Sequence, residues 1–182
     1  GFEKVWSRRL AENNPNVKIV DCSKGIALIE GHHHDDHVYE AMDPHVWSSP
    51  RAVRIFTKNI VDAMISADPE NEEMFRYNYD SFTAKIDSID SLISSALENV
   101  QERSFIIFHP ALSYFANDYN LHQHSIEFEG KNPSPVQIKN LVDIAKEEGV
   151  NTIFVQKGFD KKNAKVIASE IGAEIFEINP LS

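Results

Sequence analysis

The chain has 182 residues, a formal net charge of −10 and 42% hydrophobic residues, which is the composition of a globular protein. Nucleic-acid-binding domains usually carry a basic face, so this acidity argues against nucleic acid as a partner. Cys22 is the only cysteine, which excludes an internal disulfide and a zinc site built from cysteines. A metal site would therefore use histidines and carboxylates.

The first third of the chain predicts two helices separated by a strand and a loop. Apolar spacing indicates a helix over residues 1–12, and the apolar run at 17–21 predicts a strand. Residues 30–40 are polar, aperiodic and rich in histidine and aspartate, as is typical of a loop. The second helix begins at Ser49 and Pro50, where a capping hydroxyl precedes a proline.

Another helix start, at Asp68 and Pro69, opens the most regular pattern in the chain. The apolar residues that follow recur in steps of three, four or seven: Phe75, Phe82, Ile86, Ile89, Ile93, Ala96 and Val100. They predict one helix over residues 69–100, roughly 45 Å long at about 1.5 Å per residue. Such a helix could run the length of a two-lobed molecule, and a coiled coil is the alternative.

Predicted strands and helices alternate from residue 104 onward. The strands cover 104–108, 124–128, 152–155 and 174–178, and the helices between them cover 111–119, 134–148 and 160–171. This alternation predicts a parallel α/β sheet, in which ligands bind beyond the carboxyl ends of the strands. His109 and Asn179 directly follow two of the predicted strands, so we expect both at that edge.

Histidines are the candidate metal ligands, because imidazole suits Zn²⁺ and is neutral near pH 7. His45 lies in a loop just before a helix, beside Pro44, and His109 lies at a strand end. A structural role is an alternative for each. His122 and His124 would share one face of a strand, although such a pair more often faces solvent.

The loop at 30–40 is a candidate for weak metal capture. It holds four histidines, namely His32, His33, His34 and His37. Adjacent loop residues lack a fixed tetrahedral geometry, so we expect binding in several modes rather than one tight site. A solvated polar loop is the alternative.

No motif in the sequence indicates an enzyme. It lacks a glycine-rich phosphate loop, a Gly-x-Ser-x-Gly elbow and a His-Glu-x-x-His helix. A mononuclear zinc hydrolase is the alternative in that class, since an open zinc position could activate water. No general-base carboxylate or substrate-positioning motif accompanies His45 or His109 in the sequence.

Several segments, in order and spacing, resemble the ZnuA/TroA-like solute-binding proteins of metal ABC importers, known as cluster A-I. They are Gly-Phe-Glu-Lys-Val-Trp at 1–6, the histidine tract, Asp-Pro-His-Val-Trp at 43–47, Phe-His-Pro-Ala-Leu-Ser-Tyr-Phe-Ala at 108–116, Glu-Gly-Lys-Asn-Pro-Ser-Pro at 129–135, Ile-Phe-Val-Gln at 153–156 and Ile-Asn-Pro-Leu at 178–181. The resemblance covers essentially the whole chain.

The resemblance implies an α/β fold of two lobes, with parallel sheets flanked by helices, joined by one long rigid helix. Here the first lobe would be residues 1–68, the helix 69–100 and the second lobe 101–182. The first lobe is expected to be incomplete, because the family's first lobe starts earlier and carries another histidine ligand. A helix after Leu181 is expected to be missing too.

The function implied by the resemblance is capture of Zn²⁺ between the lobes and delivery to the membrane permease of an ABC importer. His45 matches the ligand of the first lobe and His109 that of the second, while Asn179 stands where the family usually has aspartate. Manganese-type members tend to carry glutamate in place of His109, so zinc is favoured, with a manganese or iron receptor as the alternative. The implied location is periplasmic or otherwise extracytoplasmic, with a lipid anchor in the full-length protein. A surface adhesin is a further alternative.

Overall fold

The computed structural model describes residues 3–31, 42–128 and 130–179. The four histidines of the predicted capture loop, His32, His33, His34 and His37, lie outside these ranges. Within the described residues, no helix is both long enough and apolar enough to cross a lipid bilayer.

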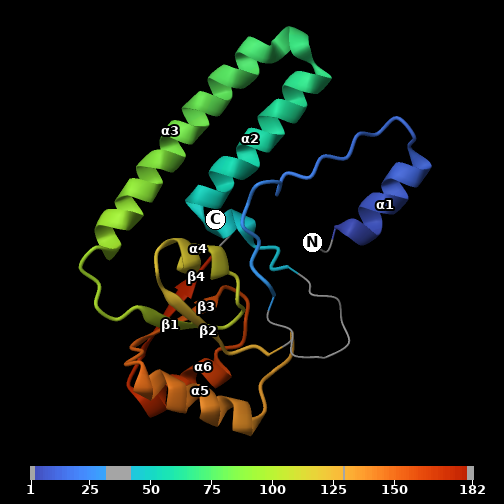
Figure 1. Ribbon diagram of the computed structural model, residues 1–182. Helices are drawn as coiled ribbons and strands as arrows, with labels where there is room; N and C mark the ends of the chain where they lie inside the picture. The colour runs from blue at the N-terminus through green and yellow to red at the C-terminus, as the bar shows by residue number, and fades with distance from the viewer. Residues whose placement is uncertain (1–2, 32–41, 129, 180–182) are drawn as a thin grey trace. The chain divides into compact units, whose positions relative to one another are not determined.

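The chain divides into two compact units, Gly1–Ser95 and Ala96–Ser182. The regular elements of the first unit are all helical (Figure 1) where the structure describes it. Its elements are α1 (Lys4–Asn13), the 3₁₀ turn η1 (Val46–Ser48), α2 (Pro50–Ala67), the 3₁₀ turn η2 (Pro69–Asn71) and most of α3 (Glu72–Leu97). The boundary between the units falls in the last turn of α3. The long helix predicted from the apolar pattern is therefore confirmed.

Helices α2 and α3 run side by side in opposite directions (Figure 1). Two ion pairs link them: Arg51 Nε lies 3.1 Å from Asp90 Oδ1, and Arg54 pairs with Asp87. Because Thr83 is buried and lies four residues before Asp87, it shares the face of α3 that is turned toward α2. Exposed ion pairs add little stability, so they mark this face rather than hold it.

The predicted apolar face of α3 is only partly correct. Phe75, Ile86 and Ile93 are half-buried, but Phe82 and Ile89 are 42% and 45% exposed. Phe82 directly precedes Thr83 and Ile89 directly precedes Asp90. Consecutive side chains of an α-helix point about 100° apart, so Phe82 and Ile89 point away from the face that Thr83 and Asp90 share. Helix α2 covers one face of α3, and Phe82 and Ile89 lie outside that face.

The strand predicted at residues 17–21 does not form. Val17, Ile19 and Val20 are 40–53% exposed, and these residues have no regular secondary structure. A strand needs a neighbour to bond its backbone groups, and the described part of this unit holds only one isolated bridge, Glu30 with Met42. The apolar run alone was therefore not enough to predict a strand at these residues.

The second unit is the predicted parallel α/β sheet. Its elements are β1 (Ser104–Ile107), α4 (Ser113–Asp118), β2 (His122–Ser125), α5 (Pro135–Glu147), β3 (Thr152–Gln156), α6 (Lys162–Ile171) and β4 (Glu174–Ile178). The strand order is β2-β1-β3-β4, and every pairing is parallel. Parallel strands place their carboxyl ends at one common edge.

The core of this unit has two layers, one on each face of the sheet. Ile106 and Ile153 are fully buried among side chains from α5 and α6, while Phe105 and Ile107 face the opposite side, near Ala116 of α4. Alternate residues of a strand point to opposite faces, so β1 is buried on both. Figure 1 shows α5 and α6 together on one face and α4 on the other.

We predict that the buried side chain of Ile167 in α6 contributes strongly to the stability of the second unit. Ile167→Ala should lower the free energy of unfolding by about 2–5 kcal/mol, because Ile167 is fully buried. Its neighbour Val166 is 47% exposed, so Val166→Ala should change that free energy by less than about 0.5 kcal/mol. Urea denaturation followed by circular dichroism measures both, and equal effects would show that the burial assignment is wrong.

Candidate metal centre

The first candidate ligand, His45, is held by a carboxylate two residues away. His45 Nδ1 lies 2.6 Å from Asp43 Oδ1, and the His45 backbone N–H donates to the same oxygen at 2.8 Å. The Asp43 side chain is 5% exposed and that of His45 17%. The imidazole also packs edge-on against Trp47, with ring centroids 5.3 Å apart.

The loop that carries His45 is fixed at both ends. The Asp43 backbone N–H donates to Ile29 O at 2.8 Å. On the other side, the fully buried Ser49 caps α2 by accepting hydrogen bonds from the backbone of Arg51 and Ala52. Ser49, part of the sequence signal for the start of α2, thus fixes the chain four residues after His45.

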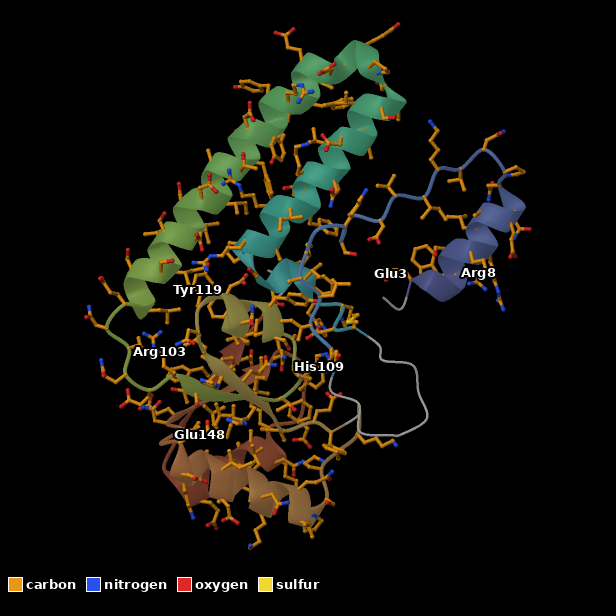
Figure 2. All side chains as sticks on the ribbon, in the orientation of Figure 1. Glu3, Arg8, Arg103, His109, Tyr119 and Glu148 are labelled. Carbon is orange, nitrogen blue, oxygen red and sulfur yellow. The ribbon has the colours of Figure 1, made fainter. Side chains whose placement is uncertain are left out.

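The second candidate ligand, His109, lies two residues beyond β1 at the carboxyl edge of the sheet. Its Nδ1 is 3.1 Å from Glu127 Oε2, and the Glu127 side chain is 12% exposed. Its ring also stacks on Phe159 at a centroid distance of 6.1 Å and an interplanar angle of 12°. Figure 2 labels His109 at one end of this unit, with Arg103 and Glu148 toward the other end.

The backbone of His109 is held by the buried side chain of Gln156, at the end of β3. The His109 N–H donates to Gln156 Oε1 at 3.2 Å, and Gln156 Nε2 donates to His109 O at 2.7 Å. One amide side chain thus satisfies both backbone polar groups of a residue that follows a neighbouring strand. This paired contact fixes the turn in which the imidazole lies.

His45 and His109 each have a carboxylate oxygen beside Nδ1. A carboxylate accepts hydrogen bonds and cannot donate them, so each Nδ1 carries the proton in its contact with Asp43 or Glu127. In a neutral imidazole the Nε2 atom is then unprotonated, which is the form that coordinates a metal. Metal-ligating histidines commonly donate their other nitrogen to a carboxylate in this way.

The remaining candidates are placed differently. Asn179 directly follows β4 and is exposed, and β3 lies between β4 and β1 in the sheet. His124 lies within β2, opposite Ile106 of β1, and its Nε2 is 2.8 Å from Oε2 of Glu148, which directly follows α5. Hydrogen bonds from Ser104 and His124 hold the pKa of the Glu148 carboxyl below its ordinary value.

In the parts of the chain that the structure describes, no three His, Cys, Asp or Glu residues are grouped so as to hold a metal ion. His45 lies in the first unit and His109 in the second. Each has a carboxylate of its own unit beside Nδ1.

The sequence reasoning missed Glu127 and Gln156 as partners of His109. The predicted strand 124–128 included Glu127, whereas β2 ends at Ser125 and leaves Glu127 just beyond the edge. With the correct end, the strand-edge rule that singles out His109 and Asn179 would have found Glu127 too.

Comparison with known proteins shows the same family over the whole chain. Residues 1–182 match the ZnuA family model, described as zinc-uptake complex component A, periplasmic. The chain is 35% identical to the high-affinity zinc uptake system protein ZnuA of Bacillus subtilis (strain 168), over 99% of this chain and 60% of that protein. It is 34% identical to the zinc-binding protein AdcA of Streptococcus pyogenes, over 84% of this chain and 29% of that protein. The chain thus spans less than two thirds of these relatives.

The fold is also similar to that of a solved relative. A crystal structure of ZnuA matches with a TM-score of 0.88 at 34% sequence identity. The match covers 100% of this chain and 70% of that one. Both units, each taken with its own helices and strands, are therefore of a known type.

We predict that Gln156 is needed to hold the His109 turn. Gln156→Ala should lower the free energy of unfolding by about 1–3 kcal/mol, because two backbone groups of His109 lose their partner. Gln101 is exposed, and Gln101→Ala should change that free energy by less than about 0.5 kcal/mol. The measurement is urea denaturation. An unchanged free energy of unfolding in Gln156→Ala would show that the two hydrogen bonds from Gln156 to the His109 backbone add no stability.

Proposed function

The chain belongs to the ZnuA family of zinc-uptake components, and on that premise we propose that it captures Zn²⁺ outside the cytoplasm for delivery to an ABC-type importer. The observation that carries the proposal is the pair of histidines, each held by a carboxylate at Nδ1. Capture and release of an ion needs ligands and an orienting frame, and no covalent chemistry. We therefore propose a binding protein rather than an enzyme.

We propose His45 and His109 as ligands of the captured zinc. Their support is the Nδ1 contacts, which leave Nε2 in the form that coordinates metal, and the match of their segments to the family pattern. Asn179 is a weaker candidate, because a neutral amide oxygen attracts Zn²⁺ less than a carboxylate does. The histidine tract of loop 30–40 would serve as an accessory that captures metal weakly.

Zinc is the proposed cargo, with manganese as the alternative. Imidazole ligands suit zinc, and hard carboxylate sites suit manganese. The relatives named above are zinc-uptake or zinc-binding proteins. The permease partner and a lipid anchor on the full-length protein are proposed from the family resemblance.

Metal titration tests the ligand assignment. In the purified full-length protein, His45→Ala and His109→Ala should each weaken zinc binding by more than about 100-fold, or about 2.7 kcal/mol, because each removes a coordinating nitrogen. Competition with a chelator of known affinity measures this loss. His124→Ala is the matched control: His124 also contacts a carboxylate, but it lies within β2 rather than beyond the strand ends. Unchanged affinity in both of the first two variants would rule out the proposed site.

The same titration tests the choice of metal. The unmodified protein should bind Zn²⁺ more tightly than Mn²⁺, because zinc lies above manganese in the order of divalent metal affinities and because imidazole favours it. Equal or tighter binding of Mn²⁺ in direct competition would contradict the zinc assignment.

A growth experiment tests transport. Deleting the gene from its host should slow growth in zinc-chelated medium, and added zinc should restore growth while added manganese should not. The intact gene should complement the deletion, and a gene carrying both His45→Ala and His109→Ala should fail to do so at equal protein level. Full complementation by the double variant would show that uptake does not depend on these ligands.

A further inference from the structure

Glu127 reaches His109 because of the register of two parallel strands. In the β1–β2 pairing Ile107 lies opposite Ser125, so His109 and Glu127 are each two residues beyond the same rung. The ladder continues past the strands: the Glu127 backbone N–H donates to Phe108 O at 2.9 Å. The two side chains therefore leave the same edge of the sheet, one from each of two adjacent strands.

The Glu127 carboxylate is largely buried and is committed to the imidazole. Its side chain is 12% exposed, and its Oε2 atom lies 3.1 Å from His109 Nδ1. Within the described residues, His109 is the hydrogen-bond partner of this carboxylate. Burying a carboxylate away from water costs free energy unless a hydrogen bond compensates for it, and the contact with His109 Nδ1 supplies that bond.

The negative charge of Glu127 would also act on a zinc ion bound to His109. The ligands proposed above, two imidazoles and an amide, are all neutral. A doubly charged ion bound by neutral groups keeps its whole charge, and that charge is stabilised by nearby carboxylates that need not coordinate it. Glu127 touches a proposed ligand and can act on the ion through the His109 ring.

We propose that Glu127 is a positioning residue for zinc capture: it holds His109 in the Nδ1-protonated tautomer, whose unprotonated Nε2 is the form that coordinates a metal, and it supplies negative charge next to the site. The inference rests on the proposed function, in which His109 is a zinc ligand. Glu127 does not itself coordinate the metal in this proposal.

Glu127 is a better test of this principle than Asp43. Asp43 Oδ1 also accepts the His45 backbone N–H, so replacing Asp43 would disturb the loop as well as the ring. Glu127 contacts the ring of His109 without a side-chain bond to the backbone among the described residues, so Glu127→Gln changes little else.

The chain offers a matched control in the pair of His124 and Glu148. These two side chains also make a histidine–carboxylate contact, 2.8 Å between Nε2 and Oε2, between a residue within β2 and one that directly follows α5. Figure 2 labels Glu148 and His109 well apart in this unit. Glu148→Gln therefore removes a carboxylate that also contacts a histidine, although it is more exposed (38%) than that of Glu127, without touching the proposed site.

The experiment compares Glu127→Gln, Glu148→Gln and His109→Ala in the full-length protein. Glu127→Gln should weaken zinc binding about 10–100-fold in chelator competition, the usual effect of removing a carboxylate behind a metal-ligating histidine. In the zinc-free protein, the ¹⁵N chemical shifts of the His109 ring should change from the Nδ1-protonated tautomer to a mixture. Glu148→Gln should leave both measurements unchanged.

The outcomes separate this inference from the proposed function. Parent-like zinc affinity in Glu127→Gln, with weakened binding in His109→Ala, would overturn the role of Glu127 and leave His109 as a ligand. Parent-like affinity in His109→Ala would instead overturn the proposed site. Weaker binding with an unchanged His109 tautomer would mean a structural role, and it would also overturn the inference.

A variant that fails to fold does not end the test. Glu127→Asp keeps the charge but is one methylene shorter, which draws the carboxylate away from Nδ1. The same two measurements on Glu127→Asp should show a changed His109 tautomer and weaker zinc binding. The parent tautomer together with parent-like affinity in this variant would contradict the positioning role.

Discussion

Strand β1 is hydrogen-bonded in parallel to β2 on one side and to β3 on the other, and the environment of His109 depends on this arrangement. Parallel pairing brings the residues that follow all three strands to one edge. Glu127 comes from the end of β2 and Gln156 from the end of β3, and both reach the residue that follows β1. Without either neighbour, His109 would lie on an unsupported turn.

The buried sheet makes this support rigid. Ile106, Ile107 and Ile153 are fully buried, so the strands that carry the edge have little freedom to shift. The entropy of orienting the imidazole is then lost on folding rather than on metal binding. The stacking of His109 on Phe159, which itself packs against Phe108, restricts the ring further.

The two candidate ligands reach a similar arrangement by different routes. Asp43 and His45 are two residues apart, so their contact is local and needs only the turn before α2. Glu127 and His109 are 18 residues apart, and their contact needs the β1–β2 register. This difference explains how much of the site the sequence could predict. The motif around His45 already contains its carboxylate, whereas the partner of His109 depends on where β2 ends.

The fold follows the same division between local and long-range causes. Periodic elements with clear ends were predictable: α6 ends at Gly172 in the left-handed conformation, and β3 is a short buried apolar run. The strand expected at 17–21 failed because a strand requires a partner, which a local apolar run cannot supply. The face of α3 was only partly predictable for a related reason, since the position of α2 decides whether Phe82 is covered.

A capture protein must bind its ion and also release it, and carboxylates that do not coordinate the ion suit both needs. A carboxylate in direct contact with zinc adds a strong bond that must break on release. A carboxylate behind an imidazole, as Glu127 is behind His109, orients the ligand and stabilises charge through a hydrogen bond that need not break when the ion leaves. Because this hydrogen bond is present without the metal, the proposed ligand would remain oriented for the next ion. For the proposed ligands His45 and His109, the contacts of Asp43 and Glu127 thus favour a site whose affinity would come from preorganised neutral groups.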